Sequence, residues 1–125
     1  MVKAVFSKNA PQPIGAYSQA VACLGFVFVS GQIALDKKSG SVVKKGIETQ
    51  TAYCLNSLCE ILKEAGSATD KVVKTTIYLS AISNFPSVNR VYSNYFKKPF
   101  PARSVVEVSG LPRGALVEIE AIATL

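Results

Sequence analysis

The feature of this 125-residue chain that most constrains its fold is a pattern of apolar residues that predicts six strands but only two helices. Apolar positions recur at helical spacing over residues 46–65 and again in the segment after Asn84. Six other segments alternate in polarity or are rich in β-branched residues, which favours strands: residues 2–6, 17–23, 26–30, 72–79, 104–109 and 116–124. The order β-β-β-α-β-α-β-β predicts an α+β fold with one mixed sheet.

Turn signals set several of the predicted boundaries. Leu24-Gly25 is a two-residue hairpin signal between the second and third strands. Gly66 follows the last apolar position of the first helix and predicts its end, because glycine readily adopts a left-handed backbone.

The second helix carries start and stop signals of its own. Ser83 or Asn84 is expected to cap its start, with Pro86 in the first turn. The apolar face continues to Phe96, and the Lys-Lys-Pro sequence at 97–99 is expected to end the helix.

The predicted sheet has more apolar surface than two helices can cover. Two helices cover one face of a six-stranded sheet, yet the strand segment Phe26-Val27-Phe28-Val29 is apolar on both sides. An uncovered apolar face usually packs against another subunit, so the sequence predicts a homo-oligomer.

Length and hydropathy limit the number of domains and the class of protein that the chain can form. The 125 residues fit one domain, spanning residues 1–125, and 49% of them are hydrophobic, which suits a compact globule. The longest apolar run, at 21–29, is interrupted by Gly25 and falls short of the roughly 18 residues that a membrane span needs. The N-terminus has no signal-peptide pattern. We therefore expect a cytoplasmic protein with no membrane partner, and mitochondrial import is the alternative.

Charge and residue types narrow the chemistry. The net charge of +6 favours an anionic partner, but the lysines are dispersed, which indicates a small acid rather than nucleic acid. The chain has no histidine, which excludes histidine bases and histidine-containing zinc sites. The cysteines are odd in number, lack CxxC spacing and are expected to be reduced and structural: Cys23, Cys54 and Cys59. We expect neither a metal nor a cofactor.

Two strand segments carry a candidate active site. Arg103 follows a stiff Phe-Pro-Ala turn, and Glu118 begins the last apolar strand. A guanidinium can hold a carboxylate with two parallel bonds, and a glutamate can activate water. If the two strands pair, the chain holds the equipment to hydrolyse a small organic acid.

Several motifs, in order and along nearly the whole chain, resemble the RidA/YjgF family of enamine/imine deaminases, also known from liver perchloric-acid-soluble proteins. The motifs are Ala10-Pro11, Ile14-Gly15-Ala16-Tyr17-Ser18-Gln19-Ala20, Ser30-Gly31-Gln32-Ile33, Val73-Lys74-Thr75-Thr76-Ile77-Tyr78-Leu79, Phe85 with Val88-Asn89, Phe100-Pro101-Ala102-Arg103-Ser104, and Val117-Glu118-Ile119-Glu120-Ala121-Ile122-Ala123.

The resemblance implies a chorismate-mutase-like fold, a homotrimer, and clefts between subunits that bind small 2-imino or 2-oxo acids. It also implies cofactor-independent hydrolysis of 2-iminopropanoate and 2-iminobutanoate to 2-oxo acids and ammonia. These imines are released by pyridoxal-phosphate enzymes that act on serine and threonine, so the implied role is damage prevention.

The matching positions assign roles to individual residues. Arg103 would hold the substrate carboxylate, Glu118 would act as acid and base, and Tyr17 would close the cleft. Ser30, Gly31, Asn89 and Val105 would contact the substrate. The alternatives are a surface ion pair for Arg103, a solvent-facing strand position for Glu118, a half-buried strand tyrosine for Tyr17, a plain turn for Gly31 and an exposed helix position for Asn89.

Two positions depart from the family pattern. Val105 stands where relatives usually carry cysteine, and valine keeps the backbone amide to which the ligand contact is attributed. Ala16 replaces the usual proline before Tyr17 and is expected to loosen that loop. Two other functions stay open: an endoribonuclease or translation inhibitor of the same family, and a non-enzymatic sensor of small acids or a chaperone.

Overall fold

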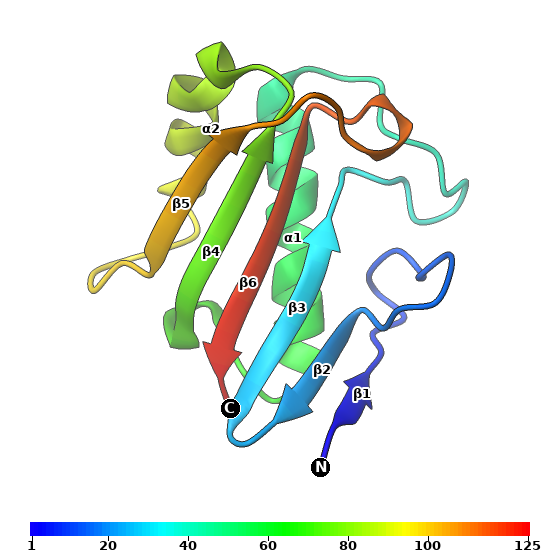
Figure 1. The fold of residues 1–125 in the computed structure, drawn as a ribbon, viewed down its shortest axis with the longest axis vertical. Coiled ribbons are helices and arrows are strands. Elements are labelled where there is room, and N and C mark those ends of the chain that lie inside the picture. The colour runs from blue at the N-terminus through cyan, green and yellow to red at the C-terminus, as the bar shows by residue number, and fades with distance from the viewer.

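The computed structural model describes residues 1–125 and contains a single six-stranded sheet. Figure 1 shows the strands side by side in the order β1-β2-β3-β6-β4-β5. Their bounds are Lys3–Val5 for β1, Ala20–Cys23 for β2, Phe26–Gln32 for β3, Val72–Leu79 for β4, Ala102–Glu107 for β5 and Val117–Thr124 for β6. Every neighbouring pair is antiparallel except β4 and β5, which are parallel.

Both helices lie behind this sheet in Figure 1, on one of its faces. Helix α1 spans Ile47–Glu64 and crosses the middle of the sheet, whereas α2 spans Phe85–Tyr92 and lies near the edge formed by β5. Helix α2 makes the crossover that two parallel neighbouring strands require. The expected α+β fold, with a mixed sheet and two helices on one face, is confirmed. Neither helix is long and apolar enough to span a membrane.

The core lies between α1 and the sheet. Leu55, Leu58 and Ile61 on the inner side of α1 are at most 2% exposed. They belong to one apolar cluster with buried strand residues such as Ile77 and Ile119. Residues of β6 alternate between buried and partly exposed, so every second side chain of this strand points into the core.

The other face of the sheet has no helix over it. Phe26, Phe28 and Val106 are 40%, 42% and 41% exposed there. Phe26 and Phe28 also contact each other, with ring centroids 6.4 Å apart. The sequence predicted this uncovered apolar face, and within one chain it is present.

Two predicted boundaries are confirmed in atomic detail. Leu24 and Gly25 both have positive φ, 52° and 80°, as a two-residue hairpin turn that matches strand twist requires. Gly66 has φ 81° at the end of α1. The Ser67 and Gly66 amides donate to the carbonyls of Leu62 and Lys63, which satisfies the last turn of the helix.

The second helix differs from the expectation at both ends. It ends at Tyr92 rather than near residue 97, because the amides of Asn94 and Tyr95 donate to carbonyls three residues back and tighten the chain into turns. The Ser93 hydroxyl also donates to the Arg90 carbonyl. At the start, Asn84 makes no side-chain cap, because it closes a 3-10 turn over Ile82–Asn84; Pro86 does lie in the first turn.

Strand boundaries also shift. The second strand begins at Ala20 rather than at Tyr17, because the buried Gln19 side chain ties the preceding loop together. Its amide donates to the carbonyls of Ser7 and Pro11, and its oxygen accepts from the Ser7 amide. The fifth strand begins at Ala102 and ends at Glu107, two residues earlier at each end than expected.

Candidate active site

A cleft of about 570 Å³ opens at the end of the sheet where β3 and β6 meet the N-terminal loop. Four of the residues proposed from the sequence line it: Tyr17, Ser30, Gly31 and Glu118. Glu120 and Arg113 line it as well. We refer to this cavity as the Glu118 cleft.

The carboxyl group of Glu118 is half-buried and has no hydrogen-bond or ion-pair partner in the chain. Burial, and secondly the negative charge of Glu120, raise its pKa above the ordinary glutamate value. A carboxyl group with a raised pKa holds its proton closer to neutral pH, which suits a group that both donates and accepts protons.

Gly31 brings the backbone of β3 against this carboxyl group. A Cβ atom on residue 31 would lie 2.8 Å from Cδ of Glu118, closer than real contacts allow. The pairing between β3 and β6 shifts register between Val29 and Gln32, around this glycine. A bulge of this kind re-aims side chains, and here the missing side chain leaves room for the Glu118 carboxyl group.

Tyr17 and Ser30 form the wall of the cleft on the N-terminal side. The Tyr17 side chain is 52% exposed, and its hydroxyl accepts a long hydrogen bond of 3.4 Å from the Ile14 amide. The Ser30 hydroxyl donates to the Ser18 carbonyl at 2.6 Å. Ser30 therefore fixes the loop that carries Tyr17, while the Tyr17 ring is free to contact a ligand.

Arg103 lies elsewhere, on β5 beside α2. Its guanidinium carbon is 5.1 Å from the ring centroid of Phe85 and 4.8 Å from that of Tyr92, within the range of cation–π attraction. Its Nη1 donates to Oδ1 of Asn89 at 2.8 Å. We refer to Phe85, Asn89, Tyr92 and Arg103 as the Arg103 edge.

This arrangement holds Arg103 in place while the other nitrogen atoms of its guanidinium group remain free to donate hydrogen bonds. The only ion pair in the chain joins Arg90 and Glu48, so the predicted alternative of a surface ion pair for Arg103 does not occur within one chain. The Tyr92 ring is fixed in turn, because its hydroxyl shares a buried hydrogen bond of 2.7 Å with Thr75 Oγ1. Burial raises the pKa of Tyr92, which keeps the phenol neutral beside the guanidinium.

Asn89 and Val105 lie on the same side of the sheet as Arg103. Asn89 contacts Arg103 through the hydrogen bond described above, so its nearest role is to orient the guanidinium. The Val105 side chain is half-buried and packs on the apolar core. Val105 lies on β5, the outermost strand of the sheet, and is the register partner of Ile77 on the neighbouring β4.

Arg103 and Glu118 do not meet within one chain. Strands β5 and β6 do not pair, because β4 lies between them, so the condition of direct pairing is not met within one chain. The two side chains also point to opposite faces. Arg103 neighbours Thr75, which points to α2, whereas Glu118 alternates with buried core residues and points to the uncovered face.

The structure adds residues that the sequence reasoning did not propose for the site. Phe85 and Tyr92 lie four residues before and three residues after the proposed Asn89 on α2, so their shared face could have been found from helical spacing. Tyr78 donates to Oε2 of Glu120 at 3.1 Å, and the two belong to neighbouring strands. No local sequence pattern predicts the contact between Tyr78 and Glu120.

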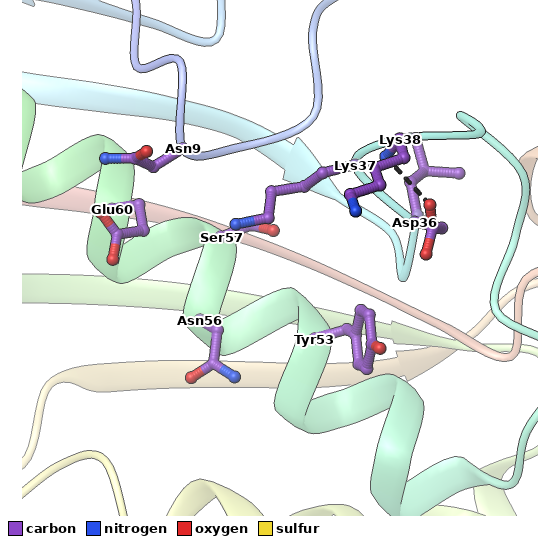
Figure 2. A pocket seen from close by; sticks show the side chains of 9 residues that line it. Asn9, Asp36, Lys37, Lys38, Tyr53, Asn56, Ser57 and Glu60 are labelled. Atoms are coloured by element: carbon purple, nitrogen blue, oxygen red, sulfur yellow. Dashed lines mark hydrogen bonds between the residues drawn. The ribbon is translucent and has the colours of Figure 1, made fainter.

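A larger cavity, of about 660 Å³, lies against α1 and shares only Leu35 with the Glu118 cleft (Figure 2). Polar side chains of α1 and the turn around Asp36 line it, and Asp36 accepts hydrogen bonds from the amides of Lys38 and Ser39. None of the site residues proposed from the sequence lies there. Size therefore does not identify the candidate site in this protein.

Comparisons with known proteins agree with the fold and show the family. The sequence model described as Endoribonuclease L-PSP matches residues 7–125. A rat protein named 2-iminobutanoate/2-iminopropanoate deaminase is 46% identical over 121 residues, which cover 97% of this chain and 88% of the rat protein.

Solved structures give the same answer. A protein of the conserved Rid family from Yersinia pestis superposes with a TM-score of 0.97 at 48% identity, covering 100% of both chains. Escherichia coli TdcF, solved with bound serine, superposes with a TM-score of 0.92 at 32% identity, covering 98% of both. The chain therefore belongs to the RidA/YjgF family, the family of the Endoribonuclease L-PSP model.

Proposed function

We propose that this protein hydrolyses small 2-imino acids, such as 2-iminopropanoate and 2-iminobutanoate, to the corresponding 2-oxo acids and ammonia. The observation that carries the proposal is the guanidinium of Arg103, which is held by two rings and one amide but has no acidic partner in its own chain. A small carboxylate matches its free donors. The 46% identity to the rat deaminase and the serine bound to the related TdcF support a substrate of this size.

The proposed site is assembled between copies of the chain. One chain places Arg103 and Glu118 on opposite faces of its sheet, so a single small acid cannot contact both within it. The uncovered face carries exposed Phe26 and Phe28 and needs a partner surface. In the proposed homotrimer, a neighbouring copy contributes its Arg103 to the Glu118 cleft, and each interface forms one complete site.

The proposed chemistry balances with water alone. Arg103 of one copy binds the substrate carboxylate, and Glu118 of the other donates a proton to the imine nitrogen as water adds to the adjacent carbon. The ionised Glu118 then takes a proton from the added water. Glu118 then returns this proton to the nitrogen, the carbon–nitrogen bond breaks, and ammonia leaves. Glu118 takes up the remaining hydroxyl proton as the carbon becomes the carbonyl of a 2-oxo acid. Acid–base help of this kind contributes about 10²- to 10⁴-fold.

The test couples a threonine dehydratase to the purified protein and follows release of 2-oxobutanoate and ammonia. We expect Glu118→Gln to lower kcat by about 10²- to 10⁴-fold. Arg103→Ala should lose about 2–4 kcal/mol of substrate binding, or roughly 30- to 1,000-fold in kcat/KM. Arg90→Ala, which removes an exposed arginine paired with Glu48, is the matched control and should behave as wild type. Unchanged imine hydrolysis in the presence of wild-type protein would refute the proposal.

Mixing the two inactive variants tests the shared site. If each cleft takes Arg103 from one copy and Glu118 from another, random assembly leaves roughly one quarter of the clefts intact. Co-refolded Arg103→Ala and Glu118→Gln chains should therefore regain up to that fraction of wild-type activity. A mixture no more active than its parts would place both residues in one chain's site and contradict the assembly. Cleavage of RNA that needs neither residue would instead favour the ribonuclease activity that the family's description names.

A further inference from the structure

Glu120 lies beside Glu118 in the same cleft but is held differently. The two carboxyl groups are two residues apart on β6, so both point to the uncovered face of the sheet. Glu120 accepts a hydrogen bond of 3.1 Å from the Tyr78 hydroxyl on β4, whereas Glu118 accepts none. Tyr78 is the register partner of Glu118, yet its hydroxyl reaches diagonally to Glu120.

We propose that Glu120, held by the Tyr78 hydroxyl, is a positioning residue that keeps the transferable proton on Glu118. This inference rests on the proposed function and adds to it a division of labour between two neighbouring carboxyl groups. A hydrogen bond donated to a carboxylate oxygen stabilises the charged form, and of the two carboxyl groups only Glu120 receives one. Two adjacent carboxyl groups do not ionise together readily, so the proton settles on Glu118.

The surroundings of Glu118 agree with this division. Burial first, and then the charge of Glu120, raise the pKa of Glu118. The groups that face it from other elements are Tyr17 from the N-terminal loop, Tyr78 from β4, Arg113 from the turn Pro112–Gly114 and, behind β6, Cys54 from α1. Lys74 of β4 lines a small cavity with Glu120 but donates to Oγ of Ser104 and forms no ion pair. Arg113 donates to the Gly40 carbonyl instead of pairing with either glutamate, and burial raises the pKa of Cys54, which keeps it a neutral thiol.

The arrangement explains why Glu118 is better suited to proton transfer than Glu120. The Glu118 carboxyl group packs against Gly31, lines the cleft and accepts no hydrogen bond, so a ligand and a water molecule can approach it from the cleft. Glu120 has one oxygen occupied by Tyr78. Its contribution is electrostatic, through Glu118, and no contact with substrate is needed for it.

The direct test is a carbon-13 NMR titration of the glutamate side-chain carboxyl signals, with the Glu118 signal assigned from Glu118→Gln. In Glu120→Gln, which keeps an oxygen for Tyr78 but removes the charge, the Glu118 titration should move to lower pH. In Glu120→Asp, which restores the charge, it should return toward the wild-type position. Glu64→Gln, which removes a charge from an exposed position on α1, is the control and should leave it unmoved.

Tyr78→Phe tests the hydroxyl separately. Without that donor the Glu120 carboxylate is less firmly held beside Glu118, so the Glu118 titration should move to lower pH, as in Glu120→Gln. A Glu118 titration that stays in place in Glu120→Gln would overturn the inference, and this readout does not need catalysis. If the wild type hydrolyses imines, the limb of its pH–rate profile that reports Glu118 should move to lower pH in Glu120→Gln. A wild type without imine hydrolysis but with the NMR shift would refute the proposed function alone.

Discussion

The Arg103 edge and the Glu118 cleft stabilise their charged groups in opposite ways. Arg103 has every neighbour that a cation favours: two ring faces, one amide oxygen and contact with water. The surroundings of Glu118 destabilise an ionised carboxylate: it is partly buried, it accepts no hydrogen bond, and a second carboxyl group lies on the same face of the sheet. The arginine is therefore prepared to stay charged and bind, whereas the glutamate is prepared to hold and release a proton.

The comparison also shows why one chain is incomplete. The edge offers Arg103 without a cavity around it, whereas the cleft offers a cavity in which Arg113 donates to the Gly40 carbonyl. The sheet separates the two regions within one chain. In the proposed assembly, a second copy against the uncovered face would bring them together.

The largest expected effect comes from breaking that contact between copies. Phe28→Glu places a carboxylate on the uncovered face, where burial without a partner would cost several kcal/mol, at least about 3. We expect monomers by sedimentation velocity and loss of imine hydrolysis, with the fold retained because Phe28 is 42% exposed in one chain.

Tyr53→Glu is the matched control, because Tyr53 is a similarly exposed aromatic residue, at 39%, but lies on the helix side (Figure 2). It should leave both assembly and activity intact. Assembly that survives Phe28→Glu would mean that the uncovered face is not the contact.

A smaller effect is expected inside the Glu118 cleft. Gly31→Ala places a methyl group 2.8 Å from Cδ of Glu118 and must push the carboxyl group aside. A displacement of this kind should lower kcat by about 10- to 100-fold with less change in KM. Gly110→Ala, where an added Cβ meets nothing within 4 Å, is the control. An unchanged kcat in Gly31→Ala would show that the exact position of Glu118 is unimportant.

The Arg103 edge should be less sensitive to loss of a single support. Asn89→Ala removes one hydrogen bond but leaves both rings, so binding should weaken by about 1 kcal/mol, or roughly fivefold in KM. The turnover number kcat should stay unchanged, because Asn89 acts on binding through Arg103. The exposed Asn94, just after α2, provides the control through Asn94→Ala. A fall in kcat rather than a rise in KM would place Asn89 against the reacting atoms instead.

The smallest effect concerns stability. The pKa of Glu118 is raised in the folded chain, so folding favours the protonated carboxyl group. Its favourable contribution to the free energy of unfolding is present below the ordinary pKa of 4.5 and is lost as the pH rises through the pKa of the folded chain. Glu118→Gln should therefore match the wild-type Tm at about pH 4 and exceed it slightly at neutral pH. Thermal unfolding followed by circular dichroism across this range checks the sign. A variant that is less stable at neutral pH would mean that the ionised carboxylate is stabilised in the fold.

Much of the fold followed from local patterns. Helical spacing located α1 and Gly66 marked its end, and Leu24-Gly25 marked the hairpin, because each depends on residues close in sequence. The end of α2 was misplaced because the apolar face continues to Phe96, and that ring stacks on Tyr92 with centroids 4.5 Å apart from a turn rather than from the helix. Burial alone does not distinguish a helix from a turn that packs on it.

The candidate site could be predicted only in part from local sequence patterns. The sequence pointed to Tyr17, Gly31 and Glu118, and the structure brings them to one cleft. It also pointed to Arg103 and Asn89, which contact each other on the other side of the sheet. The contact between Tyr78 and Glu120 links positions 42 residues apart and left no local trace.

The sequence by itself determined the elements, their apolar faces and the residue types available for chemistry, because these depend on spacing along the chain. Only the tertiary structure decided that β4 separates β5 from β6 and that Arg103 and Glu118 point to opposite faces. Strand order results from how distant segments pack together around one core. A strand's alternation tells which residues share a face but leaves open which neighbour that face will meet.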